Sequence, residues 1–155
     1  MEVREYLSKL ERNLILGSGR WVANFNESFR DFLLGGYSFA MMVRGSTRSG
    51  GFFLSRLFAT LALPDYNVAC FVYAGEVKKS TLQTIVGLLR KYMQENDIRW
   101  SWLVVPREGP FSEGLKDAVS RMDFREIGVA LLDLTSGEIH TNPHMGRKMI
   151  RYVRF

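Results

Sequence analysis

Apolar residues recur at intervals of three and four along several stretches of the chain, which is the spacing of an amphipathic helix. Val3, Tyr6, Leu7, Leu10 and Leu14 form the first such stripe. Glycine or a capping residue bounds most of these stretches, as expected at helix ends. The spacing predicts helices over residues 2–15, 25–34 and 80–95, and a short helix capped by Ser112.

Apolar runs bounded by turn residues predict strands between and after these helices. A Thr-Ser-Gly turn at residues 135–137 is expected to reverse the chain through Ile139. The last residues, 149–155, alternate in a way that predicts an edge strand. The other predicted strands cover residues 37–44, 52–63, 68–74, 100–105 and 127–134.

The order of these elements predicts a mixed α/β fold. Three successive strands favour an antiparallel meander, and the later strand–helix–strand unit favours parallel pairing with a right-handed crossover. We therefore expect a central mixed sheet with helices on its faces. A length of 155 residues is typical of one domain. It would consist of two N-terminal helices (residues 2–34), a sheet-and-helix core (37–140) and a basic tail (141–155).

Composition and charge indicate which kinds of partner to expect. Hydrophobic residues make up 46% of the chain, which is ordinary for a globular protein. The net charge of +5 favours a polyanionic partner, of which nucleic acid, and DNA in particular, is the first candidate. The single cysteine, Cys70, lies in an apolar run and fits a buried position in a reducing cytoplasm. No apolar run is long enough to span a bilayer, and charges at the N-terminus argue against a signal peptide.

The C-terminal tail interleaves cations with aromatic rings and contains no acid. Such a surface suits a phosphate backbone and stacked bases. The alternative is a basic edge strand whose charge prevents sheet-to-sheet aggregation. The tail residues predicted to bind nucleic acid are Arg147, Lys148, Arg151, Tyr152 and Arg154, and further phosphate contacts are expected from Arg44, Ser46, Arg48 and Lys79.

Two short motifs contain residues that could support metal-dependent chemistry. Asp65 follows Pro64, and a Glu76-Val77-Lys78 triplet follows the next apolar run. Two carboxylates can hold a hard cation, which lowers the pKa of bound water, and a lysine can stabilise developing negative charge. The plain alternative is that the triplet is only the polar edge of a strand that leads into a helix.

The two motifs resemble the signature of the restriction-endonuclease-like, or PD-(D/E)XK, superfamily. Its shared core is a helix, a three-strand meander, a helix and a further strand, and the resemblance covers residues 26–134. A looser similarity to archaeal Holliday-junction resolvases rests on Glu27 ahead of a glycine-rich loop. The resemblance implies a magnesium-dependent nuclease, or an inactive relative. Asp65 and Glu76 would bind magnesium, Lys78 would stabilise charge and Glu27 would be an accessory acid.

One departure from this family bears on the chemistry. The family has a hairpin turn between the aspartate and the Glu-x-Lys triplet, whereas residues 68–74 contain no turn signal. Either the strand bends near Ala69 and Cys70, or the fold lacks the metal chemistry. Two other functions stay open, namely a non-catalytic domain that binds single-stranded nucleic acid, and a protein-interaction module that forms a homodimer.

Overall fold

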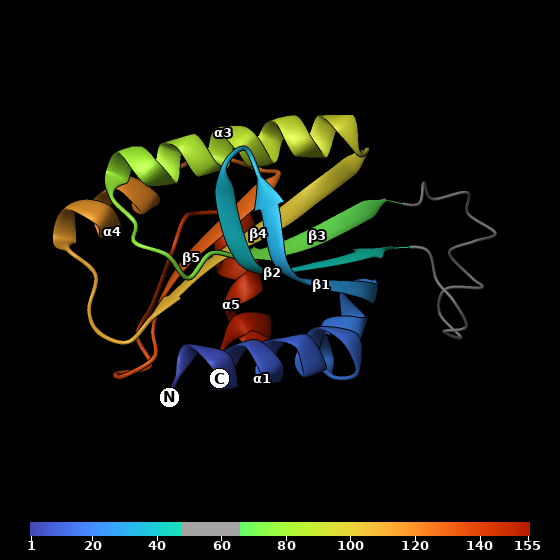
Figure 1. Cartoon of the computed structure of the whole chain (residues 1–155), viewed down its shortest axis with the longest axis horizontal. Helices are drawn as coiled ribbons and strands as arrows, with labels where there is room; N and C mark the ends of the chain where they lie inside the picture. The colour runs from blue at the N-terminus through green and yellow to red at the C-terminus, as the bar shows by residue number, and fades with distance from the viewer. Residues whose placement is uncertain (48–65) are drawn as a thin grey trace.

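The computed structural model describes residues 1–47 and 66–155. Its six strands form a single sheet with the spatial order β1-β2-β3-β4-β5-β6. Figure 1 shows this sheet with its helices. The elements are α1 (Val3–Ile15), a 3-10 turn η1 (Ser18–Trp21), β1 (Asn24–Leu34), β2 (Tyr37–Ser46), β3 (Asn67–Val72), α3 (Lys79–Glu95), β4 (Ile98–Arg107), α4 (Glu113–Ser120), β5 (Ile127–Asp133), β6 (Ile139–Thr141) and α5 (Met145–Val153).

The fold is mixed α/β, as the order of elements predicts. Strands β1, β2 and β3 form an antiparallel meander. The pairs β3–β4 and β4–β5 are parallel, and α3 and α4 supply their crossover connections. Strand β6 closes the sheet with an antiparallel pairing to β5, after the turn predicted at residues 135–137.

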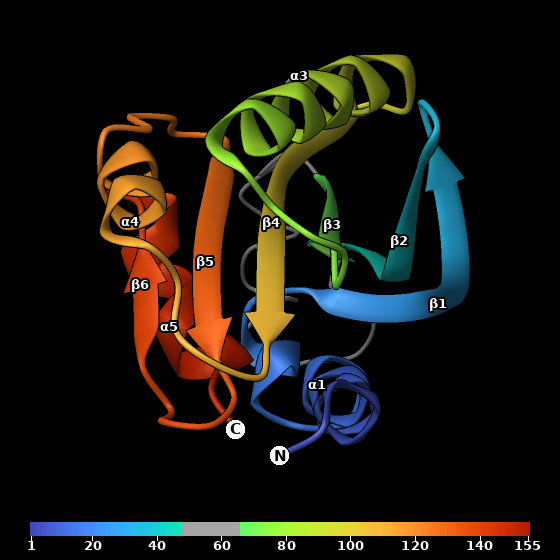
Figure 2. The same cartoon turned by 60° about the vertical axis from the view of Figure 1, so that its left-hand side comes forward.

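Helices cover both faces of the sheet, so the molecule has three layers (Figure 2). Helices α3 and α4 pack on one face, where Phe71, Leu103 and Val129 point from the sheet. Helices α1 and α5 pack on the other face, over Cys70 and Trp102. The strands in the middle are buried on both sides, which explains why β3 and β5 read as continuous apolar runs.

The predicted helix over residues 25–34 is wrong, because this segment is strand β1. It pairs with β2 through a two-residue turn at Gly35 and Gly36, with Leu34 opposite Tyr37. Both glycines have positive φ, +56° and +83°, as in the tight turns that join hairpin strands. In the sequence this glycine pair resembles a helix end, whereas in the fold it forms the tip of a hairpin. Residues 2–34 therefore form one helix, the 3-10 turn η1 and strand β1, in place of two helices.

The predicted edge strand over residues 149–155 is also wrong, because most of it belongs to helix α5. Met145, Met149 and Val153 are spaced by four residues and lie against the sheet, with Met149 and Val153 fully buried. The sequence contains this helical spacing, but the same residues also alternate between cations and apolar side chains, which favours a strand.

A close contact with β5 explains how α5 fits against the sheet. A Cβ at Gly128 would lie 2.7 Å from the Met149 sulfur and 3.1 Å from the Met145 backbone carbon, so glycine allows α5 to lie close to β5. Asn142 fixes the turn that leads into α5. Its buried amide accepts a hydrogen bond from the Val129 N–H and donates to the carbonyls of Met122 and Ile127.

The other predicted elements that fall within the described residues lie close to their expected positions. The strand expected over residues 52–63 lies outside the described residues. Strand β2 continues to Ser46, two residues beyond its predicted end at residue 44, and Gly45 and Ser46 pair with Val68 and Asn67 of β3. None of the helices within residues 1–47 and 66–155 has the length and apolar character needed to cross a bilayer.

We expect Asn142→Ala to lower the free energy of unfolding by about 3 to 5 kcal/mol, because three hydrogen bonds are removed and their backbone partners stay buried. Urea denaturation followed by circular dichroism measures this change. Asn67→Ala is the control, since it removes one exposed hydrogen bond and should cost about 1 kcal/mol or less. Equal losses of stability in the two variants would contradict a special role for Asn142.

Candidate functional site

Helix α5 and Arg154, the residue that follows it, present a surface of positive charge. Arg147, Lys148, Arg151 and Arg154 are all exposed, and no carboxylate within the described ranges forms an ion pair with any of them. No acidic residue occurs in the sequence from Ile139 to the C-terminus. A strand would have divided these cations between two faces, but the helix buries its apolar side and leaves them together on the outside. We call these four residues the α5 cations.

A row of stacked aromatic rings leads from the α5 cations to the sheet. The Arg151 guanidinium carbon lies 5.5 Å from the centre of the Tyr152 ring. Tyr152 stacks on Trp102 with ring centres 5.6 Å apart and an angle of 14° between the planes. Trp102 in turn contacts Trp100 at 5.2 Å. Trp102 is buried, whereas Tyr152 and Trp100 are half-buried, so both ends of the row reach the surface.

Helix α1 holds the end of α5 in place. The Tyr6 hydroxyl donates a hydrogen bond of 2.7 Å to the Val153 carbonyl, and the Asn13 amide donates one of 2.6 Å to the Tyr152 carbonyl. Burial raises the pKa of Tyr6 well above its usual value, and nearby Cys70 adds to this shift. The Tyr6 hydroxyl therefore stays protonated and remains a donor. Two carbonyls at the helix end, which lack helical partners, are satisfied in this way.

The other residues predicted to contact nucleic acid do not all join the α5 surface. Lys79 opens α3, on the opposite face of the sheet from α5. Arg44 and Ser46 lie near the end of β2, and Arg44 forms a long ion pair of 3.7 Å with Glu27. Arg48 lies outside the described residues. Of the residues predicted to contact nucleic acid, the α5 cations are therefore the group that the structure brings together.

The described part of the predicted metal site is dispersed. Glu76 and Lys78 are exposed in the segment between β3 and α3. Glu27 lies on strand β1 and not on a helix. It is opposite Arg44 of β2, which is itself opposite Ala69 near the start of β3. Glu76 instead follows the end of β3, and Asp65 lies outside the described residues. Across residues 1–47 and 66–155, no three His, Cys, Asp or Glu side chains gather to hold a metal ion.

Of the two alternatives that the sequence leaves open, the bend near Ala69 and Cys70 is not found. Strand β3 pairs with β2 on one side and β4 on the other, and its pairing holds through both residues. The five steps from Asn67 to Val72 extend about 16 Å at the usual strand rise. No carboxylate occurs on β2 or β3, the neighbouring strands that would carry one in the restriction-endonuclease-like family. The described residues therefore do not form a ligand set for magnesium.

One buried carboxylate has a structural role. Asp133 is almost fully buried, and its carboxylate accepts hydrogen bonds from the backbone N–H groups of Gly109, Thr135 and Ser136 and from the Ser136 hydroxyl. Burial opposes ionisation, but these hydrogen bonds outweigh it and lower the pKa of Asp133. This carboxylate fixes the turn between β5 and β6.

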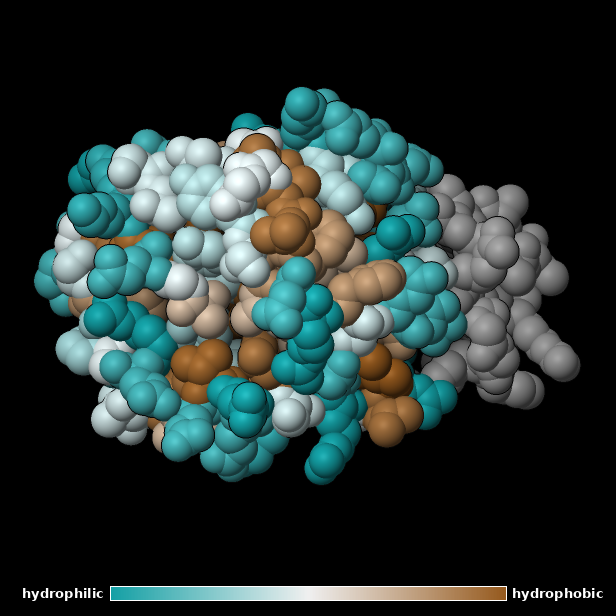
Figure 3. Space-filling model, in the orientation of Figure 1, coloured by the Kyte–Doolittle hydropathy of each residue, from teal (hydrophilic) through white to brown (hydrophobic). Residues whose placement is uncertain are grey.

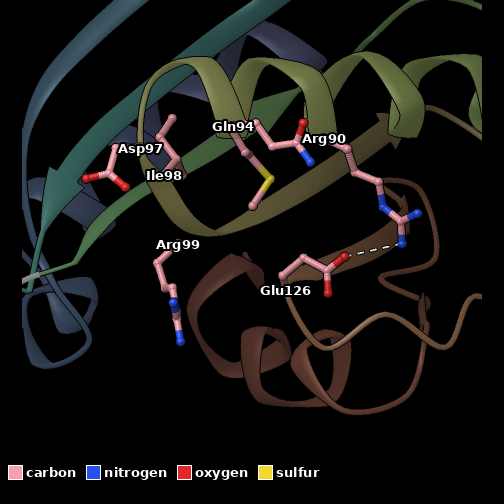
Figure 4. A pocket seen from close by; sticks show the side chains of 7 residues that line it. Arg90, Gln94, Asp97, Ile98, Arg99 and Glu126 are labelled. Atoms are coloured by element: carbon pink, nitrogen blue, oxygen red, sulfur yellow. Dashed lines mark ion pairs between the residues drawn. The ribbon is translucent and has the colours of Figure 1, made fainter.

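A shallow groove runs along α3 on the opposite face of the sheet from α5. Its first hollow, of about 440 Å³, lies where α3 leads into β4 (Figure 4). Here Arg90 pairs with Glu126 at 3.2 Å, and Arg99, Asp97 and Gln94 line the hollow around them. A second hollow, of about 400 Å³, also contains Arg90 and extends toward Lys79 and Arg121.

Apolar residues are scattered over the visible surface. Figure 3 shows them as separate patches among hydrophilic residues on the face in view. Among the described residues, the most exposed large apolar side chains include Leu16 and Leu33, which lie on separate elements. An obligate dimer interface is usually a continuous apolar surface, so this face gives no support to the expected homodimer, which stays a prediction.

Comparison with known proteins adds no assignment, since no protein-family model, curated protein or solved structure matches this chain. The geometry of the described residues is therefore the basis for any functional conclusion.

We expect Cys70 to be unreactive in the folded protein. It is fully buried, and burial raises its pKa to about 12, so the reactive thiolate is scarce at neutral pH. Its reaction with a thiol-specific disulfide reagent at pH 8 should be at least about a hundredfold slower than in guanidinium-unfolded protein. Absorbance of the released thiol measures both rates, and similar rates would contradict the burial of Cys70.

Proposed function

We propose that this chain binds single-stranded nucleic acid through the α5 cations and the aromatic row beside them, without cleaving it. The observation that carries the proposal is the joint exposure of Arg147, Lys148 and Arg151 on one short helix and of Arg154 directly after it, with no acid in the flanking sequence. Cations of this kind replace the counterions of a phosphate backbone, and the release of those counterions favours binding.

The aromatic row favours a single strand over a duplex. Tyr152 and Trp100 are both half-buried, so each offers part of a ring to a partner. Unpaired bases can stack on such rings, whereas bases in a duplex are already stacked on one another. Tyr152 already contacts Trp102 and Arg151, so its ring is ordered before a partner binds and little side-chain freedom is given up when a base contacts the exposed part of the ring.

We expect the combined substitution of the four α5 cations by glutamine to weaken binding to a single-stranded oligonucleotide by at least about a hundredfold at low salt. The slope of log K against log salt should also become shallower, by about 0.7 for each phosphate that the protein no longer neutralises. Fluorescence anisotropy with labelled DNA and RNA strands, and with a duplex of the same sequence, measures both effects.

Lys91→Gln serves as the matched control for one cation, compared with Arg151→Gln. Lys91 is also exposed on a helix, but on α3, where it pairs with Glu95. We expect its substitution to leave the affinity nearly unchanged. The proposal fails if affinity does not depend on salt, or if the fourfold variant binds as well as the parent protein.

Magnesium-dependent cleavage stays a separate prediction. One observation favours a relation to the restriction-endonuclease-like class: α1, the β1–β2–β3 meander, α3 and β4 follow the order of that family's shared core. The lack of carboxylates on β2 and β3 argues against a working site. We therefore propose that any such relation is one of scaffold and not of chemistry.

We expect no cleavage of plasmid, single-stranded or branched DNA when the protein is incubated with magnesium or manganese, because the described residues supply no ligand set. Gel electrophoresis over a long time course tests this. Cleavage that disappears in Asp65→Ala, Glu76→Ala and Lys78→Ala would instead establish the nuclease and overturn the non-catalytic proposal. Cleavage unaffected by these substitutions would point to a contaminant.

A further inference from the structure

The groove along α3 contains a glycine that the fold does not require. Gly87 lies in the interior of α3 and is exposed, and a Cβ placed on it meets no atom within 4 Å. Its φ is not positive, so no turn geometry calls for glycine. Glycine inside a helix costs about 1 kcal/mol relative to alanine. A residue that lowers helix stability and makes no close contact is explained if its lack of a side chain leaves room for a ligand.

The side of α3 that faces the groove is polar and evenly spaced. Lys79, Gln83, Gly87, Arg90 and Gln94 follow one another at intervals of three or four residues, so they lie along one side of the helix. The first four line the hollow nearer the start of α3, and the last two line the hollow nearer its end.

Two cations of this groove have no carboxylate partner among the described residues. Lys79 and Arg121 line the same hollow from α3 and from the end of α4, and neither forms an ion pair within the part of the chain that the structure describes. Asp123 lines the same hollow and contacts His144 at 2.7 Å, while Glu126 of the neighbouring hollow pairs with Arg90. Because Lys79, Arg90 and Arg121 line the hollow against this one carboxylate, the charge of its lining favours an anion.

The same hollow offers a surface for a planar group. The Arg90 guanidinium lies 4.1 Å from the centre of the Phe124 ring, so a flat, preformed stack borders the groove. Val86 and Met122 add apolar surface beside it. The Gln83 amide, which also lines this hollow, can both donate and accept a hydrogen bond.

We propose that this groove binds a nucleotide. Lys79 and Arg121 hold its phosphate, and its ring lies against the backbone of α3 at Gly87, next to the Arg90–Phe124 stack. A volume of about 400 Å³ is within the range of small-ligand pockets. Because the groove and α5 lie on opposite faces of the sheet, this proposal does not depend on nucleic-acid binding by α5.

A nucleotide can come from two sources, either free in solution or as the phosphorylated end of a strand. Isothermal titration calorimetry with the full chain compares five probes: AMP, adenosine, inorganic phosphate, and a short oligonucleotide with and without a 5′-phosphate. The chain used for the oligonucleotides carries the fourfold α5 substitution, so that binding at the other surface does not interfere. Preference for AMP identifies the free nucleotide, and preference for the 5′-phosphorylated strand identifies a strand end.

Gly87→Leu is the decisive variant, because leucine is compatible with the helix and would fill the groove. We expect it to weaken AMP binding by about tenfold or more, with a melting temperature equal to or above that of the parent. Gly114→Ala is the matched control. Gly114 is also a helix glycine whose Cβ would meet nothing, but it does not line the groove. Its substitution should leave AMP binding unchanged.

Lys79→Gln and Arg121→Gln test the phosphate end, and each should weaken AMP binding by about tenfold while leaving the weak binding of adenosine unchanged. The proposal is overturned if no phosphorylated probe binds at millimolar concentration, or if Gly87→Leu binds AMP as well as the parent does. Equal affinity for phosphate and AMP would also overturn it, since the ring would then contribute nothing.

Discussion

The need to cover both faces of the parallel strands governs this structure. Strands β3, β4 and β5 place almost only apolar side chains on either face, and their exposure to water would remove the main favourable contribution to folding. Helices α3 and α4 cover one face, and α1 and α5 cover the other. The last nine-residue helix is thus a necessary part of the core, although it is short and strongly basic.

This constraint also produces the α5 surface. With Met149 and Val153 directed at the sheet, the helical geometry leaves no position for Arg147, Lys148 and Arg151 except the outer side. Core packing therefore gathers the charge, and the binding proposal needs no element beyond the helix that the sheet already requires. The groove along α3 differs, since Gly87 contributes nothing to the packing of its own helix.

The sequence was informative where burial is nearly complete and misleading where an element is exposed or short. The apolar runs of β3 and β5 and the long stripe of α3 left little ambiguity. Strand β1 is an edge strand with most of its side chains in water, so Phe25, Phe29, Phe32 and Leu33 also fit a helical spacing. For α5, the burial of Met149 and Val153 against the sheet, which involves residues of other elements, is what the local sequence does not show.

The candidate sites were also only partly predictable from the sequence. The tail cations were visible as a cluster because they are adjacent in sequence, although the predicted strand would have separated them. The α3 groove was not predicted as a site, because Gly87 and Arg121 come from different helices and converge only in the folded chain. Its one local signal was a glycine in the middle of a strong helical pattern.

The hydrogen bonds between α1 and α5 connect residues 147 and 139 positions apart in the sequence. Closing so long a loop is entropically unfavourable until the intervening sheet has formed. We therefore expect α5 to dock after the sheet has formed. A polyanion bound to the α5 cations would hold the first and last helices together and would slow amide hydrogen exchange in both.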